Sequence, residues 1–176
     1  TQAGDAHLEG FGSREGVARG KGELFSALRG GVAVINADDV YAPLWRELAG
    51  DSSILSFGFS EQADVQALDA QPDGQGGMRF VLQAQEGRHT VSLPLPGRHN
   101  VSNALAAAAA GIAMGMDLAD IATGLARMEP PQGRLSWKTT PEGARLLDDS
   151  YNANPTSLRA GMELLAAAPG ERWLVL

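Results

Sequence analysis

Short apolar runs alternate with a helical pattern in the first third of the chain, and this alternation constrains the fold more than any other feature. Residues 32–35 (Val-Ala-Val-Ile) and 54–57 (Ile-Leu-Ser-Phe) are almost continuously apolar, as strands are when both faces of a sheet are covered. Between them a polar turn at 36–39 precedes a helical pattern over 42–49, which Gly50 ends. This order predicts a parallel sheet with right-handed crossovers.

The flanking segments extend this α/β prediction. Residues 1–12 are predicted to form a loop, and Ser13 is a suitable N-cap for a helix over 14–28. Apolar and polar residues alternate over 78–84 and again over 90–93, which predicts an antiparallel hairpin packed on the parallel layer.

The last part of the chain contains a candidate domain boundary. Helices are predicted over 100–114 and 118–127, and the first is so rich in alanine that it can pack closely on a sheet. Residues 129–133 (Glu-Pro-Pro-Gln-Gly) form the best linker candidate. Beyond it, 144–147 is predicted to be a buried strand, and 173–176 resembles a strand cut before its following loop. We therefore expect a piece of a longer protein.

Composition excludes several classes of function. The chain has 176 residues, of which 44% are hydrophobic, enough for one ordinary domain or slightly more. A net charge of -7 without a basic cluster argues against a nucleic-acid partner. The absence of cysteine excludes disulfides, thiolate zinc sites and cysteine nucleophiles. The most apolar segment, 104–116, is too short to cross a bilayer, so we expect no membrane insertion.

Polar side chains are concentrated over 148–155 (DDSYNANP), directly after the strand predicted over 144–147 and before a helical pattern over 157–168. Open α/β sheets bind their ligands at such a position, beyond the carboxyl end of a strand. The alternative that this pattern leaves open is a well-capped turn between strand and helix.

A second group of candidates surrounds the start of the Ala-rich helix. Asn100 and Asn103 are three residues apart, so both amides lie on one face of its first turn, where they suit the edge of adenine. The alternative, that Asn100 is simply the N-cap, leaves Asn103 and the neighbouring His99 unexplained. Arg134, just after the linker, can reach across a cleft to a phosphate, although solvated surface arginines share this pattern.

The third group lies near the N-terminus. His7 is in a polar segment and can bind a metal. Lys21 lies between Gly20 and Gly22, and each glycine costs a helix about 1 kcal/mol relative to alanine, a cost that often marks close backbone approach. A surface lysine is the alternative. Residues 16–21 resemble a phosphate loop but are one residue short and lack the following hydroxyl residue.

These motifs occur in the order found in the Mur ligase family, which the chain resembles over nearly its whole length. The matching stretches are AHLEGFGSREGVARGKGELF (6–25), NAD (36–38), PGRHNVSNALAAAA (96–109), GR (133–134) and DDSYNANPTS (148–157). The form of the last stretch favours the branch that joins D-alanyl-D-alanine to UDP-N-acetylmuramoyl-tripeptide. The alternatives are another ligase of the superfamily, similar to folylpolyglutamate synthase, and a non-catalytic nucleotide-binding module.

The resemblance implies an ATP-dependent amide ligase of peptidoglycan precursor synthesis, acting through an acyl phosphate, with ATP and Mg²⁺ as cofactors. His7 would be a magnesium ligand and one of two catalytic residues. Lys21 would be a second catalytic residue, because a carbamate on its amine supplies hard oxygen ligands for Mg²⁺.

The other residues that the resemblance implies bind nucleotide or substrate. They are Asn100, Asn103 and His99 on the adenine side, Arg134 at phosphate, Asp149 at the ribose, and Asn152 and Asn154 on the substrate side.

The family has three domains, and the resemblance places residues 1–131 in the later part of the central ATP-binding domain. Residues 132–176 would begin the Rossmann-like C-terminal domain. The expected fold class is thus α/β: a partial parallel-sheet, P-loop-type domain with an antiparallel hairpin, plus the start of a second domain. The phosphate loop would precede Thr1, so we expect the chain alone to be inactive. We expect a cytoplasmic monomer whose partners are the UDP-tripeptide and D-alanyl-D-alanine.

Overall fold

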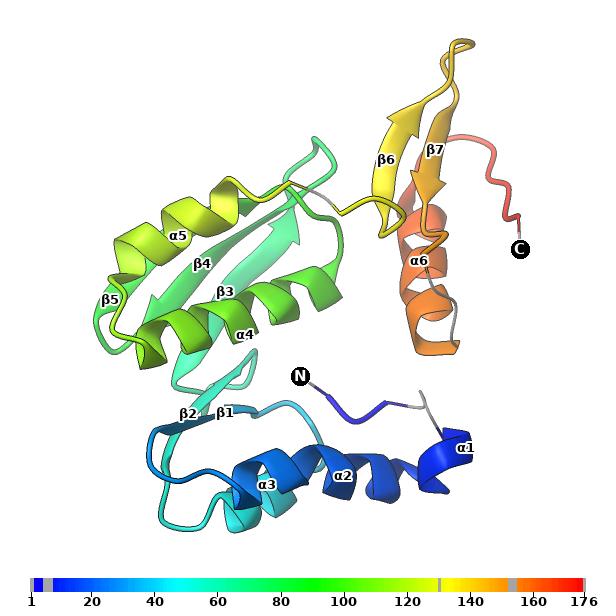
Figure 1. The fold of residues 1–176 in the computed structure, drawn as a ribbon. Helices are drawn as coiled ribbons and strands as arrows, with labels where there is room; N and C mark the ends of the chain where they lie inside the picture. Colours follow the sequence, from blue (N-terminus) through cyan, green and yellow to red (C-terminus); the bar gives the residue numbers. More distant parts are fainter. Residues whose placement is uncertain (1, 5–7, 130, 152–154, 176) are drawn as a thin grey trace.

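The computed structural model describes residues 2–4, 8–129, 131–151 and 155–175 and has a five-stranded sheet at its centre (Figure 1). The strand order is β1-β2-β3-β4-β5. The strands are β1 (Val32–Asn36), β2 (Ser53–Gly58), β3 (Val65–Pro72), β4 (Met78–Ala84) and β5 (Gly87–Leu93).

β1 and β2 are parallel, as predicted, and β3 adds a third parallel strand. β1 and β2 pair along five residues each, and β2 continues to β3 through Phe57↔Val65 and Gly58↔Gln66. β4 and β5 form the predicted antiparallel hairpin. They do not pack on the parallel layer, however, because β4 pairs with β3 along its length and so extends the same sheet. β3 offers a free edge, and pairing with it satisfies the backbone groups of β4.

Helices cover both faces of this sheet (Figure 1). α2 (Arg14–Ser26) and α3 (Ala42–Ala49) pack on one face, around Ile35 and Trp45, while α4 (Arg98–Ala113) and α5 (Leu118–Ala126) pack on the other, around Phe80. Alanine allows α4 to approach the strands closely, since Ala104, Ala108 and Ala109 are all buried. No helix in the parts of the chain that the structure describes has the length and apolarity needed to span a bilayer.

Glycines in α2 mark close approach to neighbouring helices. The N-terminal segment is not all loop as predicted, because α1 (Leu8–Phe11) forms a short helix against α2. A Cβ on Gly20 would lie 2.5 Å from the Phe11 ring, and one on Gly22 would overlap the Leu48 side chain of α3. Residues 16–21 lie within helix α2, which confirms that they are not a phosphate loop. Ser13 caps the helix as predicted, its Oγ accepting from the Gly16 N–H at 3.0 Å.

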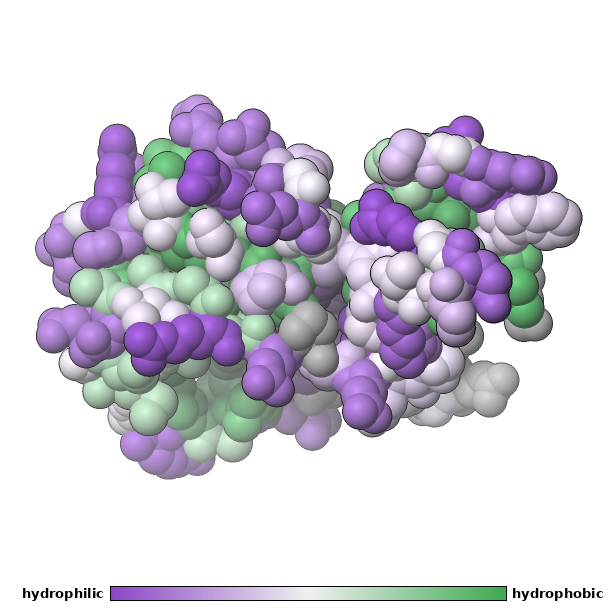
Figure 2. Space-filling view, turned by 90° about the horizontal axis from the view of Figure 1, so that it is seen from above, coloured by the Kyte–Doolittle hydropathy of each residue, from purple (hydrophilic) through white to green (hydrophobic). Residues whose placement is uncertain are grey.

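The C-terminal part forms a smaller lobe beside the first (Figure 2). It contains an antiparallel pair, β6 (Ser136–Thr139) and β7 (Arg145–Asp148), followed by α6 (Pro155–Ala167). β7 is not buried as predicted, because it pairs with β6 alone and Leu146 is 50% exposed. The predicted strand at 173–176 is absent from its described residues, 173–175, which have no neighbouring strand to supply hydrogen bonds.

The two lobes touch at the turn between β3 and β4. A Cβ on Gly76 would lie 3.3 Å from Cδ1 of Trp137 in β6. Asp73 orders this turn, since its Oδ1 accepts hydrogen bonds from the N–H groups of Gln75 and Gly77 at 2.7 and 2.9 Å. These backbone hydrogen bonds lower the pKa of Asp73, against an opposing effect of burial.

Candidate nucleotide site

The first turn of α4 presents the amides predicted to contact adenine. The helix begins at Arg98, two residues earlier than predicted, and Gly97 with φ 87° occupies the cap position, so Asn100 is not the N-cap. The Nδ2 of Asn100 donates to the carbonyl of Pro96 at 2.7 Å. The Nδ2 of Asn103 donates to the Oδ1 of Asn100 at 3.4 Å. Asn103 is exposed. The two amides thus form a polar surface at the N-terminus of α4, where the helix dipole places partial positive charge.

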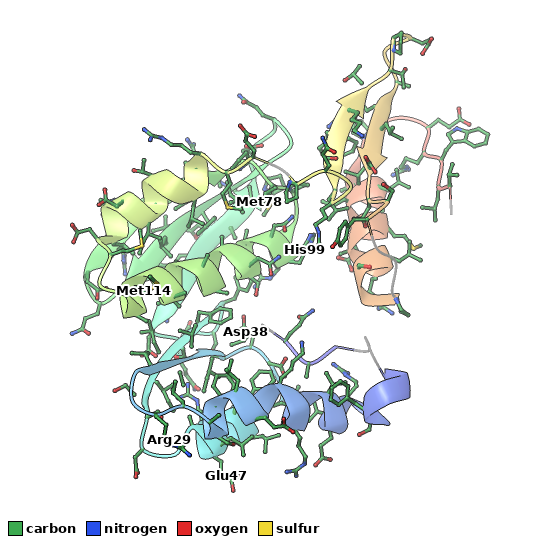
Figure 3. The ribbon with its side chains drawn as sticks, viewed as in Figure 1. Arg29, Asp38, Glu47, Met78, His99 and Met114 are labelled. Carbon is green, nitrogen blue, oxygen red and sulfur yellow. The ribbon has the colours of Figure 1, made fainter. Side chains whose placement is uncertain are left out.

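His99 connects this turn to the C-terminal lobe. Its ring lies over Gly97, where a Cβ would stand 2.6 Å from Cε1, so only glycine fits there. Burial lowers the pKa of His99, while the carboxylates of Asp149 and Glu163 act in the opposite direction. Both acids belong to the C-terminal lobe, and Figure 3 shows His99 at the end of α4 that faces it.

Asp148, the last residue of β7, and Asp149, which follows it, have different surroundings. Asp148 accepts hydrogen bonds from Lys138 Nζ at 2.6 Å and Ser150 Oγ at 2.7 Å. These partners lower the pKa of Asp148 to about 2. Asp149 instead lies beside α6, where a Cβ on Gly161 would be 3.5 Å from its Oδ2. Asp148 therefore holds β7 to β6 through Lys138, while the negative charge of Asp149 acts on His99.

Arg134 lies on the same lobe. Its guanidinium carbon is 4.1 Å from the centre of the Tyr151 ring, and the Tyr151 N–H donates to the carbonyl of Gly133 at 2.9 Å. The structure thus brings the two sequence-distant stretches 133–134 and 148–151 together. Tyr151 was not singled out by the sequence, although its place inside the polar stretch was a signal. Asn152 and Asn154 lie outside the described residues.

Lys21 is an exposed residue of α2. Its Nζ donates to the backbone oxygen of Gln2 at 2.6 Å. The same N-terminal segment is held by Asp39, whose Oδ2 accepts from the Ala3 N–H at 2.8 Å, and by Arg14, whose Nη2 donates to the Ala3 oxygen at 3.2 Å. His7 lies outside the described residues, and among those described no three acidic or histidine side chains cluster as a metal site would require.

Comparison with known proteins identifies the family. A sequence profile of the Mur ligase middle domain matches residues 1–111. The chain belongs to the Mur ligase family. The UDP-N-acetylmuramoyl-tripeptide–D-alanyl-D-alanine ligase of Escherichia coli K12 is 44% identical over 173 residues, a span that covers 97% of this chain and 38% of that protein.

Solved Mur ligase structures show the same fold. A crystal structure of MurF from Acinetobacter baumannii superposes with a TM-score of 0.90 at 38% identity, covering 97% of this chain and 37% of that one. MurF from Thermotoga maritima, solved in complex with ADP, gives a TM-score of 0.77 at 26% identity, with 96% and 38% covered. The α/β fold class is therefore confirmed, and the chain spans less than two fifths of these Mur ligases.

Proposed function

We propose that this chain is the nucleotide-binding part of an ATP-dependent ligase that joins D-alanyl-D-alanine to UDP-N-acetylmuramoyl-tripeptide. The observation that carries the proposal is the proximity of two lobes: the charge of Asp149 acts on His99, which shares the first turn of α4 with Asn100 and Asn103. Arg134 belongs to the same lobe as Asp149. Residues 1–131 would belong to the central domain and 132–176 to the start of the Rossmann-like C-terminal domain.

The side chains suit the parts of ATP. Amides at Asn100 and Asn103 offer both donors and acceptors to the adenine edge, a carboxylate at Asp149 can accept from ribose hydroxyls, and the guanidinium of Arg134 can donate to phosphate. His99 would support the adenine side, and Asn152 and Asn154 would lie toward the substrate.

The reaction needs ATP because a carboxylate oxygen is a poor leaving group. In the proposed reaction the terminal carboxylate of the tripeptide takes the γ-phosphoryl group of ATP and releases ADP. The amine of D-alanyl-D-alanine then attacks the acyl carbon, the new amide bond forms, and phosphate leaves with the carboxyl oxygen that it carried. Positioning and charge stabilisation supply most of the catalysis in phosphoryl transfer.

Magnesium belongs to the proposal as a second cofactor. Mg²⁺ requires oxygen ligands, and the Lys21 amine offers only donors, so a carbamate there is needed to make it a ligand. With His7 it would form part of the ligand set. The described residues do not make a complete magnesium site by themselves. The proposal includes a cytoplasmic location, because ATP and UDP-linked precursors are the proposed substrates. It also includes a monomeric state.

The test uses the full-length protein that contains this chain. Phosphate release from ATP should require both UDP-tripeptide and D-alanyl-D-alanine, and mass spectrometry should find the pentapeptide product. Turnover with folate and glutamate, or with the amino acids that other Mur ligases add, would favour another ligase of the superfamily. The absence of any turnover, together with an upstream sequence lacking a phosphate loop, would favour a non-catalytic nucleotide-binding module.

A further inference from the structure

The guanidinium of Arg134 is held face-on by an aromatic ring. Its Cζ lies 4.1 Å from the Tyr151 ring centre, and within the described part of the chain no hydrogen bond or ion pair engages the guanidinium. A guanidinium that stacks on a ring has its orientation restrained while all five N–H donors remain in its plane. Such an arginine is ready to bind an anion at its edge.

The backbone around Arg134 is tightly determined on its N-terminal side. Gly133 has φ 68°, and its carbonyl accepts the Tyr151 N–H at 2.9 Å. A Cβ on Gly133 would lie 3.1 Å from the Tyr151 nitrogen, so this approach of the two backbones requires glycine. The residues that carry the guanidinium and the ring are therefore held together by the main chain as well.

The backbone is equally determined on the other side. Leu135 has φ 50°, a left-handed conformation that is strained for a bulky residue. Its side chain is only 6% exposed, and its Cδ2 would be 3.6 Å from a Cβ on Gly161 of α6. Burial of Leu135 against α6 maintains the strained turn, which leaves the Arg134 side chain on the exposed side, over Tyr151. Strain of this kind gathers at functional sites.

We propose that Tyr151 is a positioning residue for Arg134: its ring holds the guanidinium plane so that the N–H donors face the phosphates of the nucleotide. This inference rests on the proposed function, because the phosphate role of Arg134 belongs to it. The hydroxyl of Tyr151 has no part in this role, whereas the aromatic face is essential.

The test compares two substitutions of Tyr151 in the full-length protein. Calorimetric binding of a non-hydrolysable ATP analogue, and the KM for ATP where turnover is measurable, report on Arg134. Tyr151→Phe keeps the face and should bind as the unaltered protein does. Tyr151→Leu should weaken binding about two- to fivefold, the effect of losing an exposed cation–π contact. Tyr151 is 66% exposed, so the thermal unfolding midpoint of the Tyr151→Leu protein should equal that of the unaltered protein.

Two controls separate positioning from a general structural effect. Arg145 lies 4.0 Å from the centre of the Trp137 ring on the same lobe, and Arg145→Lys should leave analogue binding unchanged. In an Arg134→Met background, adding Tyr151→Leu should cost almost nothing more, because no cation is left for the ring to hold.

The outcomes also distinguish this inference from the proposed function. Equal analogue binding by Tyr151→Leu and the unaltered protein would overturn the inference. It would also be overturned if Tyr151→Leu weakened binding as much in the Arg134→Met background as in the unaltered protein. Binding that follows these expectations in a protein that does not ligate D-alanyl-D-alanine would support the inference and overturn the proposed function. No nucleotide binding at all would overturn both.

Discussion

The carboxylate of Asp38 binds the backbone of Phe59: its Oδ2 accepts the Phe59 N–H at 2.7 Å, and its Oδ1 accepts the next N–H, of Ser60, at 3.0 Å. The turn after β1 is thereby tied to the turn after β2, at the carboxyl ends of both strands. The Phe59 ring in turn lies 3.5 Å from the guanidinium carbon of Arg98. Asp38 therefore acts, through Phe59, on the first turn of α4, where the adenine-side amides are.

A double-mutant cycle should show that Asp38 and Gly58 are coupled. A Cβ on Gly58 would lie 2.7 Å from the Asp38 Oδ1, so Gly58→Ala should lower the free energy of unfolding by about 1–3 kcal/mol. Asp38→Ala should cost about 1–2 kcal/mol through the lost hydrogen bonds. Together they should cost less than the sum, because the clash needs the Asp38 carboxylate.

Urea denaturation measures this cycle, and α5 offers a matched control. A Cβ on Gly124 would meet nothing within 4 Å, so Gly124→Ala should raise stability by about 0.5–1 kcal/mol. Strict additivity of Asp38→Ala and Gly58→Ala would show that the carboxylate does not determine the cost at Gly58.

The pKa of Asp148 should depend on Lys138. The folded protein holds this pKa at about 2, below the ordinary value of 3.8, so the contribution to stability is present above about pH 4 and is lost as pH falls toward 2. Lys138→Met should raise the pKa toward the ordinary value, and Ser150→Ala should raise it less. A carboxyl-carbon NMR titration measures both, and an unchanged pKa in Lys138→Met would refute the assignment.

His99 should report the contact between the lobes. Burial lowers its pKa below 6.5, so the neutral form is favoured: its contribution to stability is present above pH 6.5 and declines as pH falls through the folded value. Asp149→Asn should lower the pKa of His99 further, because it removes a carboxylate that favours the imidazolium. An imidazole NMR titration tests this, and no change would mean that the lobes do not face each other as described.

Lys21→Ala in the full-length protein should lower ligase activity by more than about tenfold, the range seen when support of a metal site is lost. Short-chain carboxylates should restore part of that activity if a carbamate is needed. The structure supplies a competing role, since the Lys21 Nζ donates to the Gln2 oxygen at 2.6 Å. If that bond is what matters, unfolding should occur at lower temperature and carboxylates should restore nothing.

Local signals predicted the elements whose stability is local. β1, α3 and β2 form within one residue of their predicted ranges, because continuous apolar runs, a polar turn and Gly50 all act within a few positions. Pro155 begins α6, at a position where its missing N–H is not needed. The motifs and their order along the chain are also sufficient by themselves to indicate the Mur ligase family.

Long-range pairing decided the rest. Alternation predicted the β4–β5 hairpin, but only the free edge of β3 placed it within the sheet. The stretches 133–135 and 148–151 each look like ordinary turns, and their meeting through the Gly133 carbonyl depends on β6 pairing with β7. Residue types and their order thus specify which chemistry the chain carries, whereas the distances between those groups depend on contacts between distant segments, which no local pattern encodes.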